Sequence, residues 1–444
     1  MRSNSVALRA SRSTVFGKSF WIISLLLTVV LFLMNHNIFT TLQETPTAEE
    51  QVGMVKEGSL ARRVGLVSLG LLGLVNLSMR PRKRCRINGS LGWLLLFFIY
   101  WSLLTVFWST DQLLTIRRLF VFFLFILGVL GVAKRCGPLE LCSFAFLSST
   151  LNLIMGIVVE IWFGTFHPFL SSYRFSGTLT PNAQGINCAI MFLSGAVICS
   201  SSNRKRANLF YFVATVIAFI FLVLTKSRGS FISMALALAV YSMLVSSSSG
   251  KAIWGFGICI IILLLMLVLG DVFISNLTQS VLLGRGDSDL PTVGVRIQLW
   301  KECLVYIARQ PILGYGYNAF WTPKIIAKMS YGQDWGPGIA EGHSAYIDLA
   351  LGTGLVGMLT YVLILVIVVK KLIALYRLSN DRTYAYWCSL IVFGISNGII
   401  ESVIIVPNVL SFIVTFVIIN LSMFGEQVRG AAGMSVGNQS NPIC

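Results

Sequence analysis

Charged residues are scarce in this sequence, and acidic ones are the scarcest. Only 11% of its 444 residues are charged, whereas a soluble domain carries about 25%. Asp and Glu number 17 against 34 Lys and Arg, and there are only 3 His. The 9 Cys form no CxxC pair and no Cys/His spacing typical of a metal site. These shortages exclude a water-soluble globular protein, a disordered chain and a disulfide scaffold.

The sequence has instead a series of long, uninterrupted apolar runs. Hydrophobic residues make up 56% of the chain, and its mean hydropathy is +0.80. A helix that crosses a bilayer needs about 20 such residues, whereas the strands of a membrane barrel would alternate apolar and polar side chains. We therefore predict an all-α polytopic membrane protein with about 12 transmembrane helices. The predicted spans are residues 20–40, 60–78, 91–108, 117–133, 139–163, 183–200, 207–225, 229–247, 252–270, 343–369, 384–400 and 403–424.

The distribution of basic residues over the connections predicts the orientation. The two tails and every second connection hold 20 basic and 3 acidic residues, with the densest block at residues 80–86 (RPRKRCR). The other connections hold 14 basic and 12 acidic residues. Cytoplasmic loops carry the excess of Lys and Arg, so both tails are predicted inside, and the net charge of +17 needs no nucleic acid as a partner.

This orientation divides the chain into five parts. They are a cytoplasmic tail (1–19), nine spans (20–270), a loop on the outer face (271–342), three spans (343–424) and a second cytoplasmic tail (425–444). The basic residues before the first span also fit a cleaved signal peptide. An uncleaved first span fits better, because two cytoplasmic tails require an even number of spans.

Residues 271–342 form one long connection among many short ones. A loop of 72 residues in a compact membrane protein is usually functional. Within it, residues 295–310 place apolar side chains at helical spacing, and Pro311 ends that helix. The following residues 312–321 (ILGYGYNAFW) indicate a turn and an aromatic segment at the membrane interface. We expect the helix to lie along the membrane surface and to cover a site beneath it.

Basic residues at the ends of the predicted outer spans are candidate ligands for an anion. Arg174 and Arg228 lie where the outer connections hold few other basic residues, and Arg228 sits between two spans with almost no loop. A charged guanidinium at that depth in the membrane is energetically costly, which indicates a functional role. The guanidinium is also the group best suited to bind a phosphate through two hydrogen bonds. For the neighbouring Lys226, snorkelling to lipid headgroups is an equally good explanation.

His343 is the candidate proton acceptor. It begins the tenth predicted span, shortly after Glu341 and shortly before Asp348. An ionisable group inside an apolar run is costly unless it faces a polar cavity, so Asp348 favours a catalytic role for this histidine as much as a headgroup contact. Gly352 and Gly354, further along the span, are explained by close helix packing.

Two further patterns carry little weight. Asp287 and Asp289 form a DxD string, which binds a metal–diphosphate in some glycosyltransferases, but a solvated turn explains it better. Gly314 and Gly316 do not form a phosphate loop, because no strand precedes them and neither a third glycine nor a lysine follows. We therefore predict no metal site.

Several strings taken together resemble the O-antigen ligase and O-antigen polymerase superfamily, including its exopolysaccharide polymerases. The resemblance extends over about residues 100–365, and the order, spacing and common predicted outer face of the strings carry it. The strings are WSTDQLLTIRR (108–118, with Arg117 and Arg118), YRFSGTLTPN (173–182, with Arg174 and Asn182), SRG (227–229), Arg296 to Trp300, PILGYG (311–316), and His343 with Gly354 at H-x10-G spacing.

The resemblance implies a helical membrane glycosyltransferase of the GT-C-like kind in a bacterial inner membrane, with its site facing the periplasm. The donor would be a glycan on undecaprenyl diphosphate, and the acceptor a sugar hydroxyl on lipid A-core or on another lipid-linked repeat. Such a transfer is inverting and needs no metal or other cofactor; other proteins of polysaccharide assembly are expected partners. The implied site residues are Arg174 and Arg228 for the diphosphate, His343 and Glu341 for proton transfer, and Arg117, Arg118, Arg296 and Asn182 for further substrate contacts.

Three functions stay open at the level of sequence. A ligase and a polymerase would share the site: Arg174 and Gly185 have the R-x10-G spacing of polymerases, but no clear second copy lies in the long loop. Ser344 also stands where the family usually has Asn after the histidine. A transporter of the lipid-linked glycan ranks third, because its polar residues would lie near the membrane midplane rather than at span ends.

Overall fold

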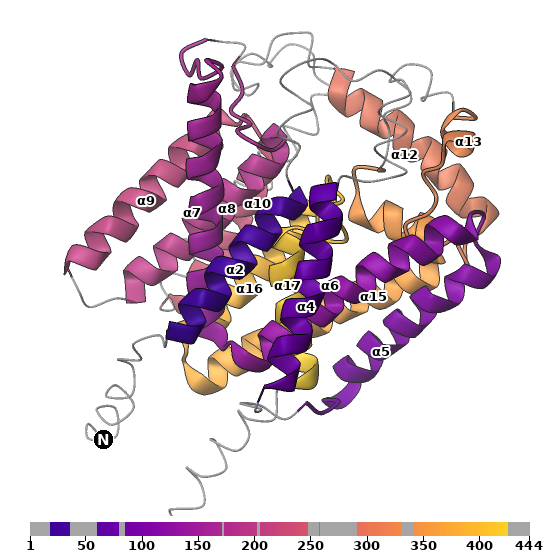
Figure 1. Ribbon diagram of the computed structural model, residues 1–444, viewed down its shortest axis with the longest axis horizontal. Helices are drawn as coiled ribbons and strands as arrows, with labels where there is room; N and C mark the ends of the chain where they lie inside the picture. Colours follow the sequence, from indigo (N-terminus) through magenta and orange to yellow (C-terminus); the bar gives the residue numbers. More distant parts are fainter. Residues whose placement is uncertain are drawn as a thin grey trace, which may run out of the picture.

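The computed structural model describes residues 18–35, 60–79, 85–170, 173–201, 205–246, 257, 291–329 and 341–424. Within these ranges all regular structure is helical (Figure 1). The helices are α2 (Lys18–Asn35), α4 (Leu60–Ser78), α5 (Gly89–Leu104), the 3-10 turn η1 (Thr105–Trp108), α6 (Gln112–Arg135), α7 (Pro138–Trp162), α8 (Pro181–Ser201), α9 (Lys205–Leu224), α10 (Arg228–Val245), α12 (Pro291–Arg309), α13 (Pro323–Ile326), α15 (Ala345–Ser379), α16 (Arg382–Asn397) and α17 (Val409–Met423).

Apart from α12, α13 and η1, these helices lie on the predicted spans with boundaries that differ by a few residues. Seven of the described helices are long and apolar enough to cross a membrane, and α2, α9 and α17 contain shorter apolar stretches. A polytopic helical membrane protein is therefore confirmed, while the number of twelve spans stays a prediction. The predicted span at 252–270, apart from Gly257, and the DxD string at 287–289 lie outside the described residues. Helix α15 continues to Ser379, well beyond its predicted end at residue 369.

Polar caps fix the starts of three helices. The side chain of Asp111 accepts a hydrogen bond from the backbone N–H of Leu114 (2.9 Å) and begins α6. Asp381 and Asn408 cap α16 and α17 in the same way. Such residues satisfy N–H groups that the first turn of a helix leaves without partners, which matters most inside a membrane.

Helix α17 lies at the centre of the bundle, and α9 lies at its edge. Nearly every residue of α17 is buried, and it contacts α5, α6, α7, α8, α15 and α16. Helix α9 instead exposes large apolar side chains such as Leu209, Phe210 and Phe212. A helix that is apolar all round is either surrounded by protein or faces lipid, and this molecule contains one of each kind.

Small residues bring α4 and α6 into direct backbone contact. A Cβ atom added at Gly73 would overlap the carbonyl of Leu127, and one added at Gly131 would overlap the carbonyl of Gly73. Glycine at these positions removes the side chains that would hold the helices apart, as is common in membrane helix pairs.

The predicted outer connections meet at one end of the bundle, which we call the site end. There the backbone N–H of Thr110 donates to the carbonyl of Tyr315 (3.2 Å), and the side chain of Asn182 donates to Glu401 (2.7 Å). Figure 1 shows α12 and α13 together beyond the helix ends on this side. The structure thus groups these connections as the charge count does, and the side of the membrane they face stays a prediction.

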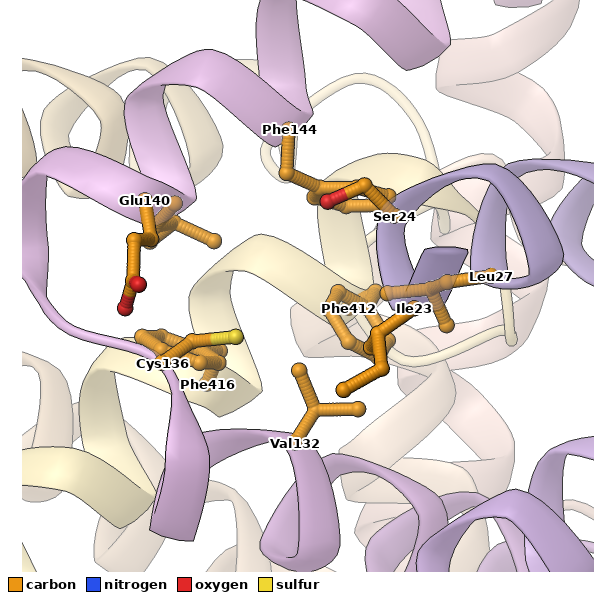
Figure 2. Close-up of a pocket in the computed structure, with 10 residues that line it drawn as sticks. Ile23, Ser24, Leu27, Val132, Cys136, Glu140, Phe144, Phe412 and Phe416 are labelled. Atoms are coloured by element: carbon orange, nitrogen blue, oxygen red, sulfur yellow. The ribbon is translucent and has the colours of Figure 1, made fainter. Parts of the chain in front are cut away.

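The predicted cytoplasmic connections meet at the opposite end. The backbone N–H of Arg86 donates to the carbonyl of Met423 (2.9 Å), which joins the start of α5 to the end of α17. A small cavity at this end is lined by α2, α6, α7 and α17, and Figure 2 shows Phe144, Phe412 and Glu140 around it. Its volume of about 10 Å³ is at the lower limit for one water molecule, so it is a packing gap and not a ligand site.

Candidate active site

Asp348 holds the turn that carries His343. Its Oδ1 accepts hydrogen bonds from the indole N–H of Trp321 (2.8 Å) and the backbone N–H of Gly342 (2.9 Å), and its Oδ2 accepts one from Ser402 (2.5 Å). The expectation that Asp348 faces a polar cavity is therefore wrong. It is buried with its oxygens occupied by protein donors, and it fixes the backbone beside His343, which adopts a positive φ of 48°.

Helix α12 covers this turn, as the amphipathic pattern predicts. Leu299, Cys303 and Ile307 are buried on one face of α12, and the indole N–H of Trp300 donates to the carbonyl of Gly342 (2.9 Å). Leu304, which the pattern places on the same apolar stripe, is instead 56% exposed. The apolar face of α12 therefore packs on the first turns of α15 rather than on a membrane surface.

The aromatic side chains after Pro311 are buried in protein, and the predicted position of the segment at the membrane interface stays a prediction. Tyr315, Phe320 and Trp321 pack with one another and with the apolar face of α12. An aromatic run looks alike in sequence whether it faces headgroups or a small protein core. Here the segment has a partner far along the chain, namely a break in α15.

Helix α15 is interrupted at Gly354, whose φ of 68° is left-handed. The backbone N–H of Leu355 donates to the carbonyl of Pro311 (2.7 Å), and the carbonyl of Leu351 accepts from the N–H of Tyr315 (2.7 Å). A Cβ atom at Gly354 would overlap the carbonyl of Ile312. Close helix packing, as predicted, is therefore only one reason for a glycine at position 354, because this residue also interrupts the helix. Residues 311–316 form hydrogen bonds with the backbone groups that the interruption leaves without helical partners.

The strings at 108–118 and 311–316 contact each other. The indole N–H of Trp108 donates to the carbonyl of Leu313 (2.9 Å), next to the bond between Thr110 and Tyr315. Of the two basic residues that follow, Arg117 is exposed, and Arg118 is half-buried near Tyr317 and Arg62. The structure does not join these two arginines to the polar cluster described next.

Glu401, which the sequence analysis missed, joins three of the candidate residues. Its Oε1 accepts hydrogen bonds from the side-chain amide of Asn182 (2.7 Å) and from the guanidinium of Arg296 (3.0 Å). Its Oε2 lies 3.8 Å from Nδ1 of His343. A second guanidinium N–H of Arg296 donates to the carbonyl of Ile400 (2.9 Å). Four elements, α8, α12 and the segments flanking α15 and α17, thus meet at one buried carboxylate.

Arg174 extends this cluster. Its guanidinium donates to Oδ1 of Asn182 (3.4 Å) and to the carbonyl of Thr225 (3.4 Å), just before α10. The loop that carries it is anchored by Glu160, whose Oε1 accepts from the backbone N–H of Ser176 (2.9 Å) and of Gly177 (2.7 Å). The hydroxyl of Tyr173 donates to the other oxygen of Glu160. Glu160 was also missed, although an acid at the end of an apolar run is the same signal that singled out Asp348.

Arg228 is the first residue of α10 and lies next to the cluster. A Cβ atom at Gly229 would overlap the side chain of Ile400, the residue whose carbonyl Arg296 holds. Gly185 also packs closely on Ser227, so the glycine of the R-x10-G string is explained by the contact between α8 and the start of α10.

The imidazole of His343 lies between two carboxylates. Nδ1 is 3.4 Å from Glu341 and 3.8 Å from Glu401. Burial alone would lower the pKa of His343, but Glu401 and Glu341 outweigh it and hold that pKa above its ordinary value. Burial raises the pKa of Glu341 to about 7, whereas His343 and Arg296 overcome the effect of burial on Glu401 and keep its pKa low. The arrangement gives the imidazole two carboxylates that can hold it in place and favour its protonated form as it accepts a proton.

The same three groups have the composition of a metal site. The nearest ligand atoms of Glu341, His343 and Glu401 lie within 4.8 Å of one another. A cationic guanidinium already contacts Glu401 at 3.0 Å, and a divalent cation there would be repelled by Arg296. The donor set therefore fits a hydrogen-bonded acid–base group better than a metal centre.

Comparison with known proteins matches part of the chain to a family model and a larger part of it to a relative. Residues 213–362, which include α10, α12, α13 and the first half of α15, match the family model described as O-antigen ligase. A protein of Haemophilus influenzae, described as uncharacterized, is 22% identical over 348 residues, covering 70% of this chain and 85% of the relative. The matched region contains Arg228, Arg296, Glu341 and His343, whereas Arg174, Asn182 and Glu401 lie outside it.

Proposed function

We propose that the chain, whose residues 213–362 match the O-antigen ligase family model, is a member of the O-antigen ligase and polymerase superfamily. As such it is a glycosyltransferase that moves a glycan from undecaprenyl diphosphate to a sugar hydroxyl at the periplasmic face of the inner membrane. One observation carries the proposal: Arg296, Asn182 and His343 converge on Glu401, with Arg174 and Arg228 beside them. Guanidinium groups that bind a diphosphate and an imidazole flanked by carboxylates are what such a transfer requires.

The bond changes assign a role to each group. The acceptor hydroxyl oxygen attacks the anomeric carbon of the donor sugar, and the bond from that carbon to the phosphate oxygen breaks. The hydroxyl proton passes to His343, whose Nδ1 faces Glu341 and Glu401, so that Nε2 is the nitrogen assigned to the acceptor. Arg174 and Arg228 stabilise the negative charge that develops on the leaving diphosphate.

Helix α12 and the segment after it exclude water in this proposal. They pack over the start of α15 and contribute Arg296 to the cluster, so the cap and one substrate contact belong to the same element. Exclusion of water matters because a hydroxide or water in place of the acceptor would hydrolyse the donor. No metal takes part, since the charge of the leaving group is met by arginines.

The test is transfer by the full-length protein in lipid nanodiscs. With a lipid-linked glycan donor and lipid A-core as acceptor, a ligase gives a single glycan–lipid A-core product and free undecaprenyl diphosphate. With lipid-linked repeats alone, a polymerase gives a ladder of lengths that stays on the diphosphate carrier. The reaction is expected to continue in EDTA. Absence of both products, or loss of activity in EDTA that a divalent ion restores, would contradict the proposal.

A further inference from the structure

Arg174 lies in the connection between α7 and α8, next to a residue that is anchored to α9. The backbone N–H of Phe175 donates to the carbonyl of Leu224, the last residue of α9 (2.9 Å). The ring of Phe175 is fully buried and packs against Phe221, with the ring centroids 4.7 Å apart. The chain directly after Arg174 is therefore fixed to the protein core.

Glu160, in the last turn of α7, binds the residues on both sides of this arginine. Its side chain accepts hydrogen bonds from the hydroxyl of Tyr173, from the backbone N–H of Ser176 (2.9 Å) and of Gly177 (2.7 Å), and from the hydroxyl of Ser176 (3.4 Å). None of these donors carries a charge. Glu160 is only 5% exposed, so it is the loop that its oxygens face, and its place in α7 fixes where the loop lies.

The loop cannot move closer to α7 than it already is. A Cβ atom added at Gly177 would lie 2.6 Å from the Cα of Gly156, one turn before Glu160, and Gly177 has a φ of 61°. Glycine at both positions brings the two backbones into contact. A shorter acidic side chain at position 160 would therefore lose its hydrogen bonds, because the loop has no room to follow it.

The guanidinium of Arg174 makes longer hydrogen bonds than the backbone around it. Its bonds to Asn182 and to the carbonyl of Thr225 are both 3.4 Å, beyond the range of about 2.7–3.2 Å that such bonds usually have. Bonds of this length can be exchanged for bonds to an anion at little cost. A fixed backbone that carries a cationic group is preorganised for an anion, since little freedom remains to be lost on binding.

We propose that Glu160 is a positioning residue for donor binding: it holds residues 173–177 so that Arg174 is directed at the diphosphate. The inference rests on the proposed function for the identity of the anion. Because the donors to Glu160 are neutral, the length and the oxygens of its side chain matter, and its negative charge does not. A glutamine can accept both backbone N–H bonds through its amide oxygen and donate its NH2 group to the hydroxyl of Tyr173.

The experiment measures binding of undecaprenyl diphosphate, without a sugar, to the full-length protein in lipid nanodiscs. Glu160→Asp keeps the charge but withdraws the oxygens by one methylene group, and the Kd should rise about tenfold as Arg174 loses a hydrogen bond to the charged ligand. Glu160→Gln should stay within about twofold of wild type, since a change that small is under 0.5 kcal/mol. Glu140→Asp is the matched control, because Glu140 accepts the backbone N–H of Gly137 (2.5 Å) at the other end of α7, and it should bind like wild type.

A double-mutant cycle decides whether Glu160 acts through the arginine. Arg174→Ala should raise the Kd tenfold or more, and Glu160→Asp should have no further effect in that background. In transfer assays Glu160→Asp should raise the KM for the lipid-linked donor and leave the KM for the acceptor unchanged, whereas a general loss of structure would alter both.

Three results would overturn the inference: additive effects of Glu160→Asp and Arg174→Ala, binding by Glu160→Asp that equals wild type, or weaker binding by Glu160→Gln than by Glu160→Asp. The last result would mean that the negative charge itself acts in the site. If wild type transfers glycan and Arg174→Ala loses donor affinity while Glu160→Asp keeps it, only the inference is wrong. If the binding cycle is as expected but wild type transfers nothing, the positioning role stands and the proposed function is wrong.

Discussion

Two regions of the site end are built in different ways, although both depend on α15. Around Glu401, side chains from distant helices meet through charged and amide groups. Around Gly354, backbone groups of residues 311–316 and 351–355 pair with each other, and glycine permits the approach. Side-chain contacts to a carboxylate can be exchanged for contacts to an anionic substrate, whereas backbone pairing in a membrane cannot be given up without cost. The first region is thus suited to chemistry and the second to holding it in place.

The largest effect is expected from His343→Ala, which removes the proton acceptor. Loss of a general base costs about 10²- to 10⁴-fold in rate, and donor binding should change little because His343 acts on the acceptor. The measurements are glycan transfer and binding of the lipid-linked donor. His167→Ala is the control, since His167 is exposed on the neighbouring connection. An equal loss of transfer rate in the two variants would contradict the assignment of His343 as the proton acceptor.

Arg228→Lys should have the next largest effect. The substitution keeps the charge but loses the planar fork that binds a phosphate through two hydrogen bonds. Loss of one hydrogen bond to a charged group, about 1.5–3 kcal/mol, lowers the rate on the order of tenfold to more than a hundredfold. Arg228→Ala should cost more, with folded protein retained. Lys226→Ala, two residues away, should change transfer little, and an Arg228→Lys variant as active as wild type would contradict the assignment to the diphosphate.

Gly354→Ala tests the second region, and its effect should be on stability. An alanine there must adopt a φ of 68° and also overlap the carbonyl of Ile312. We expect about 1–2 kcal/mol for the backbone conformation and a further 1–3 kcal/mol for the overlap, seen as a lower melting temperature in detergent. Gly164→Ala separates the two costs, because Gly164 has a similar φ of 66° with no atom within 4 Å of the added Cβ. Equal melting temperatures for the two variants would show that the contact at the break is unimportant.

The smallest expected effect is a shift in the pH dependence of transfer. His343 must be neutral to accept a proton, so the rate falls as the pH drops through its raised pKa. Glu401→Gln keeps the shape of the side chain but removes a charge that raises that pKa. The acidic limb of the rate profile should therefore move to lower pH. Glu140→Gln, at the opposite end of the bundle, should leave the pH profile unchanged. An unchanged profile in Glu401→Gln would show that the charge of Glu401 does not set the pKa of the group that controls the rate.

Helix positions could be predicted well from the sequence, because hydropathy and caps are local signals. The apolar run predicts a span at 117–133, which lies within α6, but it misses the start of the helix at Gln112, where Asp111 is the cap. The residues that carry the site are less accessible. Glu401 lies in a connection that the predicted spans leave only two residues long, and nothing nearby in sequence indicates that Asn182, Arg296 and His343 will surround it. Its one local signal is a single acid between two apolar runs, which is easily taken for a solvated turn.

The role of the long loop could be predicted only in part. The periodicity of residues 295–310 correctly indicates a helix with one apolar face, since periodicity depends on a single element. Whether that face and the aromatic residues after it meet lipid or protein depends on α15, whose break lies some 40 residues further along the chain. The glycine at position 354 looks in sequence like any packing glycine, and its left-handed conformation becomes apparent only when residues 311–316 are beside it.

The pairing of residues 311–316 with 351–355 also limits how the protein can be recombined with its relatives. A chimera that exchanges the outer loop alone would join one parent's turn to the other parent's interrupted helix, and the released carbonyl and N–H groups would no longer face matching partners. Crossover points placed before Pro291 and after Leu355 would keep both halves of the pairing from one parent. Under the proposed function, acceptor preference should therefore be transferable between relatives as a block that includes the first half of α15, and not as a loop.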